Sequence, residues 1–431
     1  MNIVMLSNTF TPHVGGVARS LEAFTAEYRR RGHRVMVVAP QFSHMPTDET
    51  DVLRIPAVQN FNGSDFSVVL PMSGLLSRTL DEFQSEIVHA HHPYLLGMTA
   101  LRIARYRGLP LVFTHHTLYE QYTHYVPGDS PTLRQFVIEL ATQYANLCDQ
   151  VFAPSESIAS LLHERGVIAP IAVVPTGVSM ERFARGDGAG FRASMGIPHD
   201  DFVVGHLGRL APEKNLTFLA EAVAALLESD TAAHFLVVGK GPSEADIHRI
   251  FERRGLSKRL WLVGVLEHPR LADAYHAMDA FAFASKTETQ GMVLTEAMAA
   301  GVPVIALDAS GVREIVQDGC NGRLLGEETR DGFCDALRWV AHVDSAQRSA
   351  LSRAALETAH AFSLPRTADK ALACYEALKS KALLVPRADE NERWENLLHL
   401  IKAEWDIVKS VTAAAGSAFE TVEAPSRSPP T

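Results

Sequence analysis

The feature that most constrains this sequence is a strand, a polar loop, a helix and a second strand in direct succession between residues 280 and 306. Ala280–Ala284 is an apolar run typical of a buried parallel strand. Ser285–Gly291 is small, polar and turn-forming, and Met292–Ala300 is apolar at helical spacing. Gly301-Val302-Pro303 ends that helix before the predicted strand Val304–Ala306. The pattern predicts an α/β fold in which a glycine-bearing loop meets a helix N-terminus, an arrangement that binds anions.

Two glutamates bracket this loop. Glu288 and Glu296 have seven residues between them. A helix N-terminus already attracts phosphate, so carboxylates beside it suit hydroxyl groups, such as those of sugar and ribose rings. The alternative is a capped helix that carries an ordinary surface glutamate.

The stretch 284–304 resembles the donor site of the retaining GT-B glycosyltransferases of family four, where two glutamates at this spacing hold the nucleotide sugar. Thr287-Glu288-Thr289-Gln290-Gly291 is most similar to the diacylglycerol glucosyltransferase branch. Elsewhere in the family, Phe-Gly or Tyr-Gly more often stands at Gln290-Gly291. The resemblance implies that Glu288 holds sugar hydroxyls and Glu296 the ribose. It also implies that the start of the helix contacts the donor, through Gly291, Met292 and Val293.

Length and composition exclude several classes of protein. A chain of 431 residues exceeds the size at which one core keeps growing, so we expect two domains. The formal net charge of −10 argues against nucleic-acid binding. The four cysteines are scattered without a CxxC pair, which favours reduced thiols in a cytoplasmic protein. We expect neither a signal peptide nor a transmembrane span, because no apolar run approaches the roughly 20 residues required.

The N-terminal region predicts a βαβ unit. Asn2–Leu6 and Val35–Ala39 are strand-like, and Val17–Arg31 between them has helical spacing. Gly15-Gly16 stands at the carboxyl end of the first strand, where parallel sheets bind ligands. It is either a tight turn or a loop that a phosphate approaches closely. The family resemblance favours the second interpretation and places Gly16 on the donor and Gly15 on the acceptor side.

Five histidines follow two further predicted strands, Ile87–His89 and Leu111–Phe113. They invite a zinc hypothesis, although no carboxylate or cysteine is spaced as a further ligand; the alternative is a polar pocket wall. Thr114-His115-His116-Thr117 is similar to the family's strand that ends in His-Thr. That similarity implies that His116 faces sugar and acceptor. The five are His89, His91, His92, His115 and His116.

Aromatic and basic residues in the same region raise the question of a membrane. Leu118–Ser130 lacks periodicity and contains three tyrosines, which either pack the loop onto the domain or seat it at a lipid interface. Arginines at 29–34 and 102–107 form either solvated helix faces or a surface for anionic lipid headgroups. We place His91 and Tyr119 with His116 on the acceptor side.

The pattern restarts at Phe202–Gly205, followed by Gly208–Asn215. Two cations five residues apart at a strand-to-helix junction, Arg209 and Lys214, can clamp a diphosphate, and the string is similar to the family's Gly-Arg-Leu-x-x-x-Lys-Asn motif. Charges that merely flank a surface loop are the alternative. Gly239-Lys240-Gly241 half matches a dinucleotide fingerprint, but glutamate replaces its third glycine. We therefore expect Gly241 beside a nucleotide rather than in a dehydrogenase.

These observations predict two doubly wound Rossmann-like domains of GT-B architecture that face a central cleft. We expect an acceptor domain over 1–180 and a nucleotide-sugar domain over 181–365, with a glycine-rich linker region at 176–200. A helix over 366–385 crosses back to the first domain, followed by an amphipathic helix over 386–411 and a disordered tail over 412–431.

The predicted activity is retaining transfer of a hexose, glucose from UDP-glucose, to a lipid such as 1,2-diacylglycerol. His116, Arg209, Lys214 and Glu288 carry the reaction, and no metal or other cofactor is expected. The protein would be cytoplasmic and peripheral on an anionic membrane surface. One alternative is a transferase to a soluble acceptor from GDP-mannose or a UDP-sugar. Another is a non-catalytic nucleotide-sugar sensor.

Overall fold

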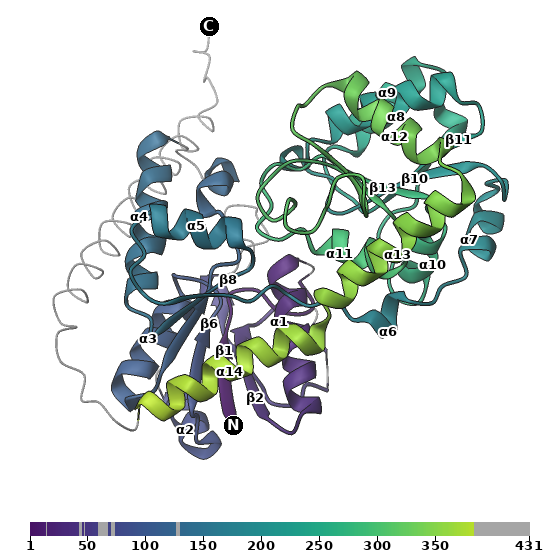
Figure 1. Ribbon diagram of the computed structural model, residues 1–431. Helices are drawn as coiled ribbons and strands as arrows, with labels where there is room; N and C mark the ends of the chain where they lie inside the picture. Colours follow the sequence, from purple (N-terminus) through teal and green to yellow (C-terminus); the bar gives the residue numbers. More distant parts are fainter. Residues whose placement is uncertain are drawn as a thin grey trace, which may run out of the picture.

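The structure is a computed structural model that describes residues 1–13, 15–42, 45–46, 48–58, 68–69, 74–125 and 130–382. The predicted helix over 386–411 and the predicted tail lie outside these residues, as does part of the tyrosine-containing loop. Figure 1 shows two sheets, each covered by helices, joined by the chain near residue 176 and by a long helix near the end of the described chain.

The N-terminal sheet has seven strands in the order β3-β2-β1-β6-β7-β8-β9, and its neighbouring strands pair in parallel. Val4 of β1 stands between Met36 and Val88 in this register. The strands are apolar on both faces because helices cover both faces. The bounds are β1 (Asn2–Leu6), β2 (Arg34–Pro40), β3 (Val52–Ile55), β6 (Ile87–Ala90), β7 (Leu111–Thr114), β8 (Gln150–Ala153) and β9 (Ile171–Val173), with a small antiparallel pair β4 (Ala57–Val58) and β5 (Val68–Val69).

Two separate apolar clusters hold this domain together, one on each face of the sheet. Leu21, Phe24 and Tyr28 of α1 share one cluster with Tyr375 of the last helix, α14 (Leu364–Ala382). The other cluster contains side chains of α2, α3, α4 and α5. The helices are α1 (Gly16–Arg30), α2 (Gly74–Phe83), α3 (Leu96–Arg107), the 3-10 helix η2 (Tyr119–Tyr125), α4 (Pro131–Asn146) and α5 (Glu156–Glu164).

The C-terminal sheet has six strands in the order β12-β11-β10-β13-β14-β15, again paired in parallel. Its strands are β10 (Phe202–Leu207), β11 (Ala233–Val238), β12 (Leu260–Leu262), β13 (Ala280–Phe283), β14 (Val304–Leu307) and β15 (Gly322–Leu325). Around it lie α6 (Met180–Phe183), α7 (Gly188–Met195), η3 (Pro212–Lys214), α8 (Leu216–Ser229), α9 (Glu244–Arg253), η4 (Ser257–Arg259), α10 (Arg270–His276), α11 (Met292–Ala299), α12 (Arg330–His342) and α13 (Ser345–Ala361). The two sheets confirm the predicted pair of doubly wound domains.

The glycine-rich stretch 176–200 is not simply a linker. It contains α6 and α7, and Phe183 and Phe191 lie in the core of the C-terminal domain. A Cβ on Gly188 would lie 2.2 Å from the backbone oxygen of His276, so this glycine permits close packing onto α10. The interpretation of these glycines as linker residues was therefore wrong, since glycine serves tight contacts as well as turns.

Helix α14 crosses from the C-terminal domain onto the N-terminal sheet, where it lies beside α1 (Figure 1). The hydroxyl of Tyr375 on α14 is hydrogen-bonded to Nδ1 of His89, 2.6 Å away. Nε2 of His89 lies 2.7 Å from Oγ1 of Thr114. The last helix is thus joined through a buried polar network to two strands of the first domain.

Candidate functional site

The donor loop, residues 285–291, lies between β13 and α11 at the carboxyl end of the C-terminal sheet. Gly291 has φ +71°, a left-handed conformation that glycine adopts without strain, and it ends the loop as the N-cap of α11. Met292 and Val293 follow in the first turn, where backbone N–H groups have no acceptor within the helix. The loop therefore brings Glu288 and a helix N-terminus to one place.

Glu288 and Lys214 come together from the segments that follow two neighbouring strands, β13 and β10. Nζ of Lys214 lies 2.5 Å from Oε1 of Glu288, and both side chains are largely buried. Burial works to raise the pKa of Glu288, but the charge of Lys214 and hydrogen bonds from Lys214 and Ser285 lower it below the ordinary value. The predicted diphosphate ligand and the predicted sugar ligand thus form one ion pair.

Arg209 lies on the same loop as Lys214 but is more exposed. Its side chain is 52% exposed and pairs with Glu213, four residues later. Around it, Leu210 N donates to Lys240 O over 2.9 Å, and Ser243 N donates to Leu210 O over 2.8 Å. A Cβ on Gly241 would lie 2.3 Å from Leu210 O. The glycine turn at 239–241 therefore supports the arginine loop by close backbone contact.

Glu296 lies on α11 and is buried. Tyr275 OH donates to its Oε2 over 2.8 Å, and Arg19 of α1 lies 3.9 Å from its Oε1. Burial raises the pKa of Glu296, which Arg19 and the hydrogen bond from Tyr275 offset in part. This glutamate therefore stands where the two domains meet, within reach of a cation from the first domain.

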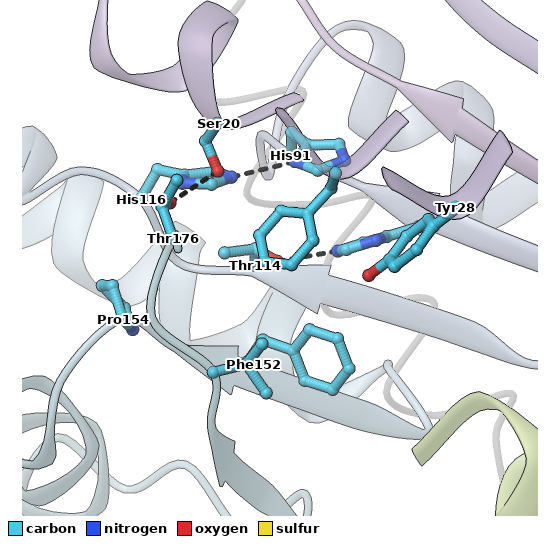
Figure 2. A pocket seen from close by; sticks show the side chains of 11 residues that line it. Ser20, Tyr28, His91, Thr114, His116, Phe152, Pro154 and Thr176 are labelled. Carbon is cyan, nitrogen blue, oxygen red and sulfur yellow. Dashed lines mark hydrogen bonds between the residues drawn. The ribbon is translucent and has the colours of Figure 1, made fainter. Parts of the chain in front are cut away.

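The histidines form a polar wall at the carboxyl ends of β6 and β7. Nδ1 of His91 lies 2.9 Å from Nε2 of His116, and the two rings stack with centroids 5.1 Å apart. Figure 2 shows this pair above a small cavity that Ser20, Thr114 and Thr176 also line. Burial lowers the pKa of His116 to about 3 and the pKa of His91 well below its usual value. Both imidazoles are therefore neutral hydrogen-bonding groups at neutral pH.

The zinc hypothesis is not supported by the described part of the chain. Each of three candidate ligands has another partner: His89 bonds Tyr375 and Thr114, His91 bonds His116, and His92 Nδ1 accepts from Asn8 N over 3.2 Å. Among the described residues, no group of three or more His, Cys, Asp or Glu side chains is arranged to hold a metal ion.

Gly15 and Tyr119, both predicted on the acceptor side, have different surroundings in the structure. Gly15 is the N-cap of α1, where a Cβ would lie 3.2 Å from Nε2 of His13, whereas a Cβ on the neighbouring Gly16, predicted on the donor, would meet no atom within 4 Å. Tyr119 is buried at 8% exposure and packs its ring against Tyr94 and His115. It therefore fixes η2 to the domain instead of facing a membrane.

Two arginines of the basic clusters form hydrogen bonds and an ion pair within the N-terminal domain. Arg29 donates to backbone oxygens of Val35, Thr50 and Asp51, and Arg107 donates to Ser77 O over 3.0 Å and pairs with Asp81. Both clusters include the last turns of helices, α1 and α3, which run from the carboxyl ends of their preceding strands back toward the amino ends of the sheet. The solvated-face and lipid-surface interpretations therefore give way to a structural role for these two side chains.

His206, which was not predicted from the sequence, lies on β10 just before the arginine loop. Its Nδ1 lies 3.0 Å from Ala282 O, so Nδ1 carries the proton and donates. Its buried Nε2 has no hydrogen-bond partner among the described residues, and burial lowers its pKa to about 4. Lys214 and Glu288 both act on its titration. A histidine inside an otherwise apolar strand, two residues before Gly208-Arg209, was the available signal.

Comparison with known proteins agrees with this geometry. Residues 14–182 match the domain described as Glycosyltransferase Family 4, and residues 189–358 match the domain described as Glycosyl transferases group 1. The chain is similar in fold to Anabaena HepE in complex with UDP, with a TM-score of 0.68, 22% identity and coverage of 88% of this chain and 100% of HepE.

Relatives with different substrates resemble the chain. Alpha-monoglucosyldiacylglycerol synthase of Streptococcus pneumoniae is 27% identical over 330 residues, 75% of each chain. D-inositol 3-phosphate glycosyltransferase of Actinosynnema mirum is 34% identical over 303 residues, 67% of this chain and 72% of the relative. GDP-mannose-dependent alpha-mannosyltransferase of Mycobacterium tuberculosis is 28% identical over 396 residues, 88% of this chain and 98% of the relative.

The two matched domains, the relatives and the GT-B fold agree with the predicted family. The chain therefore belongs to the family-four GT-B glycosyltransferases, near the alpha-monoglucosyldiacylglycerol synthases, and is a hexosyltransferase.

Proposed function

We propose that this enzyme transfers glucose from UDP-glucose to a diacylglycerol-type lipid with retention of configuration and without a metal. The observation that carries the proposal is the donor loop, whose Thr-Glu-Thr-Gln-Gly string places Glu288 against Lys214. The relatives named as alpha-monoglucosyldiacylglycerol synthases and the UDP complex of HepE support the lipid acceptor and the UDP donor, respectively.

The described residues suit a reaction in which negative charge grows on a leaving diphosphate. Arg209, Lys214 and the first turn of α11 would stabilise that charge, a contribution worth several kcal/mol. Glu288 would then hold sugar hydroxyls and Glu296 the ribose. His116 shares its Nε2 with His91, so its Nδ1 would serve a sugar or acceptor hydroxyl. The acceptor would attack from the face of the leaving group.

An apolar surface beside the tyrosine-containing loop supports a lipid acceptor. The first half of α4 carries apolar side chains that are only partly buried, and α4 packs along η2. A partly buried apolar helix end can rest in a lipid interface. No helix of the described residues is long and apolar enough to cross a membrane. The partly buried side chains are Leu133, Phe136, Val137 and Ile138.

A transfer assay tests this function. The protein is incubated with labelled UDP-glucose or GDP-mannose and with diacylglycerol in detergent, inositol phosphate or a simple sugar. We expect label on diacylglycerol from UDP-glucose, at an unchanged rate in EDTA. Label on inositol phosphate, or transfer from GDP-mannose alone, would replace the proposal with the soluble-acceptor alternative. Activity that EDTA abolishes and a divalent ion restores would overturn metal independence.

A further inference from the structure

The donor loop is bound to the other domain at the position where this sequence departs from the more usual family pattern. Thr289 and Gln290 directly follow Glu288. Oγ1 of Thr289 donates to the backbone oxygen of His116 over 2.8 Å, and the backbone oxygen of Thr289 accepts from Oγ of Ser155 over 2.8 Å. The loop therefore contacts the ends of β7 and β8.

Gln290 completes the attachment by a two-point contact. Its Oε1 accepts from Thr176 N over 2.6 Å, and its Nε2 donates to Thr176 O over 2.6 Å. A backbone N–H and C=O on one residue fix the orientation of the amide, because the N–H donates only to the amide oxygen and the C=O accepts only from the amide nitrogen. The side chain is 4% exposed, so both bonds are shielded from water.

The surroundings hold both partners of this contact in place. Oγ1 of Thr176 lies 2.7 Å from Oγ of Ser20 on α1, as Figure 2 shows. Behind the loop, a Cβ on Gly311 would lie 2.5 Å from the backbone nitrogen of Gln290, so only glycine leaves room for the loop there. An aromatic side chain at 290 would leave the buried N–H and C=O groups of Thr176 without these partners, which destabilises the contact.

We propose that Gln290, assisted by Thr289, is a positioning residue that holds the donor loop on the N-terminal domain and so sets the place of Glu288 relative to His116. Their relative position matters for the reaction, because Glu288 and His116 come from different domains and must contact the same sugar. The nucleotide itself would bind to C-terminal residues that do not depend on this contact. This inference rests on the glycosyl transfer proposed above, but not on the identity of the acceptor.

Kinetics of two variants test the proposal. Gln290→Met keeps the length of the side chain but removes both hydrogen bonds, and Thr289→Val removes the hydroxyl while keeping the branch. We expect kcat to fall about 10- to 100-fold in each, because a displacement of about 1 Å costs up to that much. The Kd for UDP, measured by calorimetry, should change less than about twofold. Thr289→Ser, which retains the hydroxyl, should restore kcat.

Ser157→Ala is the matched control. Ser157 N lies 2.8 Å from Oε1 of Glu314, and its hydroxyl bonds the same oxygen, so it also joins the two domains but does not touch the donor loop. It should keep kcat within about twofold. An equal loss in this variant would mean general domain docking and would overturn the proposal. So would an unchanged kcat, or a loss of UDP affinity equal to the loss of kcat, in Gln290→Met.

The outcome of this test does not depend on the identity of the acceptor. Turnover is measured with whichever donor and acceptor the wild-type enzyme uses, or as hydrolysis of the donor. Hydrogen exchange of residues 285–291 and 114–117 in the ligand-free protein adds a readout without turnover. Both segments should exchange faster in Gln290→Met than in Ser157→Ala. Failure of the wild type to glucosylate diacylglycerol would affect only the proposed function, whereas equal exchange would contradict the positioning role.

Discussion

At the scale of single residues, Lys214 and Arg209 differ in what surrounds them. Lys214 is largely buried and neutralises Glu288, whereas Arg209 is half exposed and pairs with Glu213, whose own side chain is only 5% exposed. Removing a cation that faces a leaving diphosphate removes transition-state stabilisation in both cases. Each substitution also takes a cationic partner from a largely buried carboxylate, Glu288 or Glu213. The two substitutions should therefore lower both activity and stability.

We predict that Lys214→Ala and Arg209→Ala each lower kcat by about 10²-fold or more. Each should also lower the free energy of unfolding by about 1 kcal/mol or more, measured by urea denaturation, because each removes the cation beside a largely buried carboxylate. Lys286→Ala is the control, because Lys286 lies on the donor loop but pairs outward with Glu328. A loss of less than about threefold in both variants would move the diphosphate elsewhere.

His115 allows a prediction about pH. Both ring nitrogens are buried with no hydrogen-bond partner among the described residues, and burial lowers its pKa to about 3. In the unfolded chain His115 takes up a proton near pH 6.5, whereas in the folded protein it stays neutral until the pH approaches 3. The contribution of His115 to the free energy of unfolding is therefore fully present above pH 6.5 and declines as the pH falls toward 3. His115→Phe removes this pH-dependent contribution, so the free energy of unfolding should decrease less as the pH falls.

Urea unfolding at pH 7.5, 6.0 and 4.5 measures the effect. We expect His115→Phe to be at least as stable as wild type at pH 7.5 and to lose less stability at pH 4.5. His199→Gln, at a side chain that is 82% exposed, serves as control and should follow wild type. A steeper decline in His115→Phe would show that the ring has a polar partner in solution.

At the scale of elements, α14 ties the end of the described chain to the first domain through Tyr375. This hydroxyl is buried and is hydrogen-bonded to His89, which in turn contacts Thr114. Tyr375→Phe keeps the packing of the ring but leaves Nδ1 of His89 unpaired. We predict a loss of about 1–3 kcal/mol in the free energy of unfolding with kcat nearly unchanged.

Urea unfolding with Tyr106→Phe as control checks this prediction. Tyr106 is 90% exposed, so loss of its hydroxyl should change nothing. An unaltered stability in Tyr375→Phe would mean that the network contributes little to docking α14. A large fall in kcat with wild-type stability would instead connect the network with the reaction.

At the scale of the whole molecule, contact with a membrane depends on a local surface, because the net charge of −10 opposes anionic lipid. The arginine clusters lie away from the donor loop and Tyr119 is buried, so α4 is the better candidate. We predict that the enzyme floats with phospholipid vesicles and that Leu133→Ser with Val137→Ser reduces the bound fraction at least fivefold, since apolar contact would supply most of the affinity.

Flotation is compared between anionic and zwitterionic vesicles at low and high salt. Arg102→Gln, at an exposed position on α3, should bind like wild type. Binding that disappears with salt and not with the α4 substitutions would assign the contact to charges. No flotation under any condition would remove the membrane from the proposal.

Local patterns in the sequence were sufficient for the fold and for much of the proposed site. Apolar runs predicted β1, β2, β10, β13 and β14, because a strand covered on both faces must be apolar throughout. Parallel strands then bring their carboxyl ends to one edge of each sheet. Loops that follow those strands could be assigned to the cleft by that rule alone. Lys214, Glu288 and His116 were identified in this way, with the family resemblance.

What tertiary structure decided is the partner of each of these side chains. The pairing of Lys214 with Glu288 spans 74 positions, and the contact of Gln290 with Thr176 spans 114. The local periodicity of apolar residues does not indicate contacts between residues so far apart in the sequence. Likewise, arginines that look like a lipid surface in sequence bind backbone oxygens in the fold, and the residue at 119 is buried. Composition and spacing determine which groups stand at a strand end, whereas burial and partner depend on what the rest of the chain brings against them.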